Sequence, residues 1–214
     1  LALTATFVLA VVLTQSRSAM ALCALPLGLA VLRLFKASSW ARPALLSLAG
    51  VAVCGVALQA ISPANRITTA IDRFSQGDGH RAALWQDTAV AAQRYWPAGS
   101  GMGTFDEVIQ LDESLEDLAP RTAGRAHNDY LEWAIEGGLP AMLLALAWLV
   151  VLARLAWQAR HSPYRWTAWT GGTAMLAIAL QSLTDYPLRN QALLAMAALA
   201  LLLLARPARQ GDRP

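Results

Sequence analysis

Three side chains stand where they could act on an anionic substrate. Arg17, in Gln15-Ser-Arg-Ser18, follows the first apolar stretch, and Arg81 opens a predicted helix. A guanidinium binds phosphate through a planar fork of N–H donors. His127 directly precedes a second predicted helix, and a histidine can exchange a proton near neutral pH. Together these residues indicate a phosphate-and-hydroxyl site, with scattered interface anchors as the alternative.

Other residues that resemble known sites have simpler explanations. Gly99, Gly101 and Gly103 are spaced as G-x-G-x-G, but a predicted helix and a proline precede them. A dinucleotide-binding loop follows a strand, so the pattern favours a turn. The acidic segment 106–117 lacks the ordered spacing and central glycine of a calcium loop. Both cysteines lie in apolar runs without C-x-x-C spacing, and we expect no metal and no cofactor.

The elements that must position these residues are predicted to be membrane helices. Of 214 residues, 56% are hydrophobic and 14% charged, and the mean hydropathy is +0.40. Globular domains carry roughly 25% charged residues, so the composition excludes a soluble monomer. The apolar stretches of spanning length are Ala19–Phe35, Pro43–Ile61, Leu139–Trp157, Trp166–Leu183 and Leu188–Ala205. Leu1–Leu13 is shorter than the ~20 residues of a span, which predicts a truncated helix in the C-terminal part of a longer protein.

The distribution of charge predicts which side of the membrane each segment faces. Twelve of the fourteen acidic residues lie in the insert 62–138, whereas the short segments on the other side carry nine basic residues. The positive-inside rule places those short segments in the cytoplasm and the insert in the periplasm. The predicted fold is an all-α polytopic bundle of about six transmembrane spans with one large periplasmic loop containing short helices. The expected divisions are three transmembrane helices in 1–61, a periplasmic loop in 62–128, a surface helix and three transmembrane helices in 129–206, and a cytoplasmic tail in 207–214.

Two helices are predicted within and after the periplasmic loop. Arg81–Trp96 has an apolar face and ends before a proline. The second helix should begin at Asn128 or Asp129, with Glu132 completing a capping box. It should run to Gly137-Gly138 and lie on the bilayer surface through its apolar face.

Several short motifs occur in the order found in one family of membrane enzymes. They are Thr14-Gln-Ser-Arg17, Arg81-x-x-x-Trp85, Pro97-x-Gly-x-Gly-x-Gly-Thr-Phe105, His127-Asn-Asp-Tyr-Leu131, Glu136-Gly-Gly-Leu-Pro140 and Asp185-Tyr-Pro-Leu188. No single motif is specific, but the ordered set, which covers about residues 14–190, resembles the O-antigen ligase and polymerase superfamily. One departure is Gln181, where we expect a histidine in many relatives.

The resemblance implies an activity and its partners. Members of this family are multi-pass enzymes of the bacterial inner membrane whose large loop and active site face the periplasm. They transfer a glycan from an undecaprenyl-diphosphate carrier to an acceptor hydroxyl, with no metal and no other cofactor. The expected partners are therefore the carrier-linked glycan, an acceptor such as lipid A-core, and membrane lipids, but not nucleic acid.

The resemblance also assigns roles to particular residues. Arg17 and Arg81 would bind the donor diphosphate and balance the charge that grows on it as it leaves. His127 would be the catalytic residue, a general base that accepts the proton of the acceptor hydroxyl. Direct displacement would invert the anomeric centre. The residues expected to support the site are Asn128, Tyr130 and Glu136.

Other functions remain open from sequence. An O-antigen polymerase or a protein O-oligosaccharyltransferase would share the chemistry and differ from a ligase only in the acceptor. A small-anion transporter belongs to another class and usually carries ionisable groups within its spans. Most of the predicted spans have no such group in their central parts, which disfavours transport. A purely structural membrane subunit is a further alternative.

Overall fold

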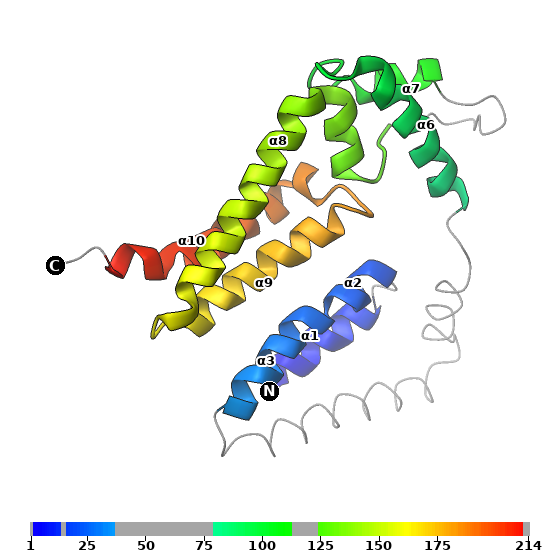
Figure 1. Ribbon diagram of the computed structural model, residues 1–214. Helices are drawn as coiled ribbons and strands as arrows, with labels where there is room; N and C mark the ends of the chain where they lie inside the picture. Colours follow the sequence, from blue (N-terminus) through cyan, green and yellow to red (C-terminus); the bar gives the residue numbers. More distant parts are fainter. Residues whose placement is uncertain (1, 14–15, 37–78, 113–123, 212–214) are drawn as a thin grey trace, which may run out of the picture. The chain divides into compact units, whose positions relative to one another are not determined.

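The structure, a computed structural model, describes residues 2–13, 16–36, 79–112 and 124–211. Every regular element in these ranges is helical (Figure 1), so the expected all-α class is confirmed for the part of the chain that is described. The predicted span Pro43–Ile61 lies outside it. The chain divides into two compact units, residues 1–77 and 78–214.

The first unit contains three described helices, with a break inside one predicted span. Its helices are α1 (Ala2–Leu13), α2 (Arg17–Leu22) and α3 (Ala24–Lys36). The predicted span over Ala19–Phe35 is broken at Cys23, which is the C-cap of α2. Pro26 explains the position of the break, because a proline ring crowds the carbonyl four residues earlier, here that of Leu22. In the first turn of α3, the missing N–H of Pro26 costs no hydrogen bond.

The second unit contains the remaining helices. They are α6 (Gly79–Tyr95), α7 (Phe105–Asp112), α8 (Asp129–Gln158), η1 (Ala159–His161), α9 (Arg165–Gln181), η2 (Pro187–Arg189) and α10 (Gln191–Gly211). Helix α6 agrees with the predicted Arg81–Trp96 to within two residues. Helix α7 is not predicted, since its residues stand out in the sequence only as part of an acidic segment. Helices α9 and α10 pack along each other, and α6 packs against α7 and α8.

Helix α8 changes direction at Gly138, where the sequence predicts the end of one helix and the start of the next (Figure 1). Gly138 has φ 54° and ψ −145°, a conformation that residues with a Cβ rarely adopt. A Cβ at this position would also overlap the carbonyl oxygen of Pro97. The amide of Leu139 donates to that same oxygen at 2.8 Å. Residues 129–138 therefore form a separate helical segment in front of the apolar stretch that starts at Leu139.

The apolar face of this first segment is buried by protein. Ile135 is fully buried in one cluster with Leu84 of α6 and Phe105 of α7, and Leu131 packs against the same cluster. The expectation that this face lies on the bilayer surface is therefore wrong. The face is covered because α6 and α7 pack against the segment. Burial against these helices removes its apolar area from water as contact with lipid would.

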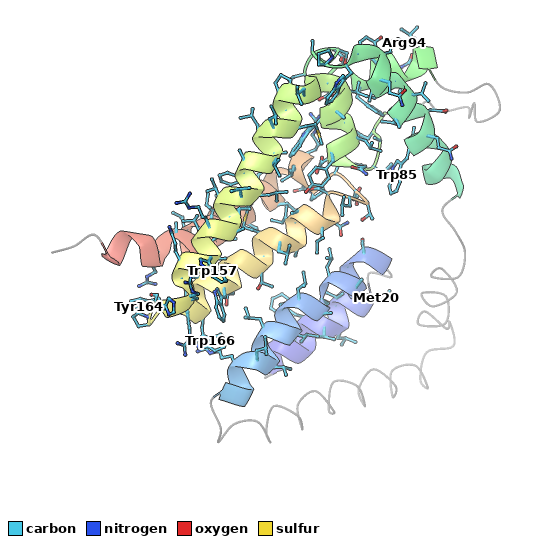
Figure 2. The ribbon with its side chains drawn as sticks, viewed as in Figure 1. Met20, Trp85, Arg94, Trp157, Tyr164 and Trp166 are labelled. Carbon is cyan, nitrogen blue, oxygen red and sulfur yellow. The ribbon has the colours of Figure 1, made fainter. Side chains whose placement is uncertain are left out.

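Only one helix in the described ranges is long and apolar enough to cross a membrane unaided. It covers Asp129–His161, and two shorter apolar helices cover Ser18–Arg33 and Gln191–Arg206. This is fewer than the predicted six spans. The difference arises because Cys23 interrupts one stretch, a second stretch is outside the described residues, and α9 has only 17 residues. Aromatic side chains gather at the turn between α8 and α9, where Figure 2 shows Trp157, Tyr164 and Trp166.

Candidate functional site

His127 has an unusual backbone that its neighbours hold in place. Its φ of 50° is the only positive φ among the non-glycine residues that the structure describes. Ala126 is fixed on both sides, because Trp85 Nε1 donates to its carbonyl at 2.8 Å and its amide donates to Glu132 Oε1 at 3.0 Å. A left-handed residue that its surroundings over-determine is typical of functional sites. The conformation therefore supports a role for His127 beyond packing.

The His127 imidazole is oriented by a carboxylate. Its Nδ1 lies 3.3 Å from Asp185 Oδ1, with the two side chains 36% and 44% exposed. The Tyr186 ring lies beside it, with ring centroids 5.0 Å apart. We assign the Nδ1 proton from this contact, since Asp185 can only accept when ionised. The lone pair then lies on Nε2, which makes no hydrogen bond with another described residue. An imidazole in this tautomer can accept a proton from a hydroxyl.

The segment that carries Asp185 is tied to the first turn of α8. Asn128 Nδ2 donates to the Leu183 carbonyl at 3.0 Å, and the Asp129 amide donates to the Ser182 carbonyl at 2.9 Å. Ser182 Oγ in turn donates to Asp129 Oδ2 at 2.9 Å, and the Leu188 amide reaches the same oxygen at 3.3 Å. The contact between the carboxylate of Asp185 and the imidazole is thus set by bonds that join segments more than 50 residues apart in sequence.

Asn128 also caps α8 without the predicted capping box. Its Oδ1 accepts from the amides of Tyr130 and Leu131, so the helix begins at Asp129. With Asn128 as the N-cap, Glu132 is one position too late for a capping box. Its carboxylate accepts from the Ala126 amide instead. The capping-box prediction is therefore wrong, and the actual bond holds the residue immediately before His127.

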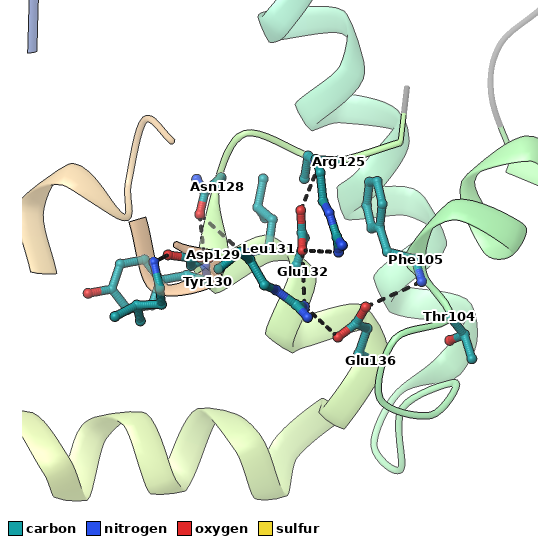
Figure 3. A network of polar contacts seen from close by, with 12 residues as sticks. Thr104, Phe105, Arg125, Asn128, Asp129, Tyr130, Leu131, Glu132 and Glu136 are labelled. Carbon is teal, nitrogen blue, oxygen red and sulfur yellow. Dashed lines mark hydrogen bonds and ion pairs between the residues drawn. The ribbon is translucent and has the colours of Figure 1, made fainter. Parts of the chain in front are cut away.

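Three acidic side chains follow one face of the first segment of α8. Asp129 and Glu132 are fully buried, and Glu136 is 2% exposed. Arg189 of η2 bridges two of them, because its Nη2 lies 3.2 Å from Glu132 Oε2 and 2.9 Å from Glu136 Oε2. Arg125 Nη1 lies 3.4 Å from the same Glu132 oxygen (Figure 3). These five side chains form the buried acid–arginine cluster.

Burial has the largest influence on the pKa values of Asp129 and Glu132, both of which precede the apolar stretch that starts at Leu139. It raises the pKa of Glu132, although the Ala126 amide, Arg189 and Arg125 all favour the charged form. It likewise raises the pKa of Asp129 against the hydrogen bond from Ser182. The Oδ1 of Asp129 is buried with no hydrogen-bond partner among the described residues. Both acids are therefore costly to bury as anions, and the arginines offset part of that cost.

Glu136 connects the cluster to the glycine-rich loop. Its Oε1 accepts from the Phe105 amide at 3.3 Å, while Oε2 pairs with Arg189. Its carbonyl accepts from the Gly101 amide at 2.9 Å. The side chain thus joins the start of α7 to η2, a supporting position. Tyr130 holds α8 to α9, with its hydroxyl donating to the Ala179 carbonyl at 3.0 Å.

The two arginines predicted to bind diphosphate are placed only through their backbones. Arg17 is the first residue of α2, whose N-cap Ser16 accepts from the Ala19 amide. Arg81 lies in the first turn of α6. Their side chains lie outside the described part, and the two residues belong to different units. The structure therefore places Asn128 directly after His127 and places Tyr130 and Glu136 on the helix that follows. It leaves the diphosphate clamp as a prediction.

Several residues of the observed site have no role in the sequence-based prediction. They are Arg125, Asp129, Glu132, Asp185 and Arg189. The sequence does contain a signal for Asp129 and Glu132, because their spacing of three residues, and of four from Glu132 to Glu136, places all three acids on one helix face. Within the described ranges, no three His, Cys, Asp or Glu side chains are grouped so that they could hold a metal ion.

The fold and the site describe a helical protein with a membrane-spanning candidate and a carboxylate-oriented histidine in front of it. Residues 2–146 match the O-antigen ligase family, and the chain belongs to this family. The family comprises membrane-bound enzymes of the O-antigen ligase and polymerase type. No curated protein and no solved structure shows a significant match to the chain.

Proposed function

We propose that the protein transfers a glycan from undecaprenyl diphosphate to an acceptor hydroxyl, such as one on lipid A-core, at the periplasmic face of the inner membrane. The observation that carries the proposal is the His127–Asp185 contact at 3.3 Å, made by a histidine with a left-handed backbone. General bases need an orienting partner and a free acceptor atom. This pair supplies both within a family of membrane enzymes that act on lipid-linked glycans.

The proposed topology keeps the expected six spans. Helix α8 crosses the membrane from Leu139, and α9 and α10 return and cross again as shorter helices. Residues 62–128 are periplasmic, and the turn at η1 is cytoplasmic. Basic side chains at that turn support this orientation, since Arg160 lies 4.0 Å from the Trp157 ring centroid and Arg165 lies 5.6 Å from that of Trp166.

The proposed mechanism is a single displacement without a metal. Nε2 of His127 accepts the proton of the acceptor hydroxyl while that oxygen attacks the anomeric carbon. The bond from this carbon to the diphosphate oxygen breaks, and the anomeric centre inverts. Asp185 stabilises the imidazolium that forms, and Arg17 and Arg81 stabilise the departing diphosphate.

The acceptor decides between ligase, polymerase and protein O-oligosaccharyltransferase. The full-length protein in liposomes should receive a purified undecaprenyl-diphosphate glycan together with lipid A-core, a second carrier-linked glycan or a serine-containing peptide. We expect lipid A-core to gain the mass of the glycan, as measured by mass spectrometry. Growth of the carrier-linked glycan or of the peptide would reassign the acceptor, and no transfer to any of the three would contradict the proposed activity.

The diphosphate clamp predicts that lysine cannot replace Arg17 or Arg81. Lysine keeps the charge but loses the planar fork that binds two phosphate oxygens at once. We expect each Arg→Lys variant to transfer much less glycan than the wild type, measured as initial rates at matched protein levels. Arg160→Lys, at the opposite end of α8, is the control and should stay active. Full activity of both Arg17→Lys and Arg81→Lys would remove the clamp from the mechanism.

A further inference from the structure

The glycine-rich loop between α6 and α7 exposes apolar side chains without any charge. Residues 95–105 contain no charged side chain. Trp96 is 50% exposed and Met102 is 68% exposed. Apolar surface becomes evidence of a contact with lipid or protein where it adjoins further exposed apolar surface, so the position of the loop relative to α8 decides its meaning. The proposed chemistry does not use this loop, so its surface needs a separate explanation.

The loop is fixed rigidly to the bend of α8. The amides of Ser100 and Gly101 donate to the carbonyls of Ile135 and Glu136, at 2.8 and 2.9 Å. Gly99 packs so closely on this bend that a Cβ would meet the Glu136 carbonyl. The Leu139 amide donates to the Pro97 carbonyl at 2.8 Å. The loop therefore stays level with the point where the apolar stretch begins.

The length of α8 places that point at the membrane surface. At about 1.5 Å per residue, Leu139 lies about 27 Å along the helix from Trp157. Trp157 is exposed, with Arg160 over its ring, as is typical of an aromatic belt at the lipid–water interface. The hydrocarbon core is ~30 Å thick. If Trp157 marks one interface, Leu139 marks the other.

We infer that the loop 96–104 inserts into the outer lipid–water interface, with Trp96 and Met102 in contact with lipid. The inference rests on the proposed placement of α8 across the membrane. Lipid is the partner because the exposed flank of α8 continues from the loop as Leu139, Leu143 and Leu144, the last being 72% exposed. The exposed apolar side chains of α8 thus begin at the point where the loop is hydrogen-bonded to it. By holding the bend at the interface, the loop fixes the depth of the helix segment that follows His127.

Spin labels at single cysteines test the inference in the full-length protein in liposomes. Cys23 and Cys54 are first replaced by alanine, and Met102→Cys, Gln110→Cys or Leu144→Cys is then added. All three positions are exposed, so a label should leave the fold intact. The measurement is the collision rate of each label with oxygen, which concentrates in lipid, and with a water-soluble nickel chelate. Gln110 is the control in water on α7, and Leu144 is the control in lipid on α8.

We expect the oxygen-to-nickel ratio at position 102 to be several-fold higher than at position 110 and closer to that at position 144. A ratio at 102 equal to that at 110 would place the loop in water and overturn the inference. Protection of position 102 from both reagents would overturn it too, because protein would then cover the loop. If position 144 itself collided freely with nickel, the placement of α8, and with it the membrane topology, would be wrong.

Discussion

Replacing His127 with asparagine is expected to lower glycan transfer by about 10²–10⁴-fold, the usual cost of removing a general base. Asparagine tolerates the left-handed backbone that His127 adopts at φ 50°. The substitution should therefore leave the loop between Ala126 and Asn128 intact. What it removes is the imidazole nitrogen that the proposed mechanism uses as the proton acceptor, since an amide does not take up a proton near neutral pH.

The measurement is the initial rate of transfer in liposomes, with donor binding measured separately. His161→Asn is the matched control, because His161 lies at η1 beyond the far end of α8 and should tolerate the change. Donor binding to His127→Asn should be close to that of the wild type, since the proposed diphosphate contacts do not involve His127. Near-normal turnover by the variant would show that another group removes the proton.

Local sequence patterns were sufficient to predict the features that depend on neighbouring residues. The helix α6 follows from its apolar face and the proline that ends it, and the bend in α8 follows from Gly137-Gly138. The N-cap follows from Asn128, whose short side chain reaches the free amides of the first turn. The family also follows from motif order, as the match over residues 2–146 confirms.

Contacts between distant segments could not be predicted in the same way. The Asp185 and Arg189 side chains reach His127 and Glu136 across more than 50 residues of chain, and no local pattern encodes such a distance. The prediction that the apolar face of residues 129–138 lies on the bilayer surface is wrong for the same reason. An amphipathic helix has the same periodicity whether lipid or another helix covers its apolar face. Only the packing of α6 and α7 against the segment shows that protein, and not lipid, covers this face.

The same long-range contacts predict a large loss of stability in Arg189→Leu. Arg189 is 29% exposed at its side chain and pairs with two carboxylates, Glu132 and Glu136, whose side chains are fully buried. Removing the cation from a buried ion pair leaves uncompensated charge, which costs about 3–5 kcal/mol. We expect a correspondingly lower melting temperature in detergent, followed by tryptophan fluorescence. Arg125→Leu is the matched control, since Arg125 shares Glu132 but is 41% exposed and should cost no more than about 1 kcal/mol.

Acid should reduce the defect of Arg189→Leu. Burial already raises the pKa of Glu132, and Arg189 opposes that rise, so the leucine variant should raise it further. A carboxyl with a higher pKa in the folded than in the unfolded chain binds its proton more tightly when folded. Stability then falls as the pH rises from the unfolded pKa through the folded pKa, and it returns as the pH is lowered through the same window. The difference in melting temperature between Arg189→Leu and the wild type should therefore shrink toward acidic pH.

Neutralising the partners separates charge from lost packing. Arg189→Leu combined with Glu132→Gln and Glu136→Gln keeps the shape of both side chains and removes both charges. If buried charge causes the defect, the triple variant should melt above Arg189→Leu at neutral pH and should lose most of its pH dependence. If the triple variant melts no higher, the guanidinium stabilises the fold through packing and its hydrogen bonds. In either case the measurement assigns the role of the contact that joins η2, the glycine-rich loop and the segment that follows His127.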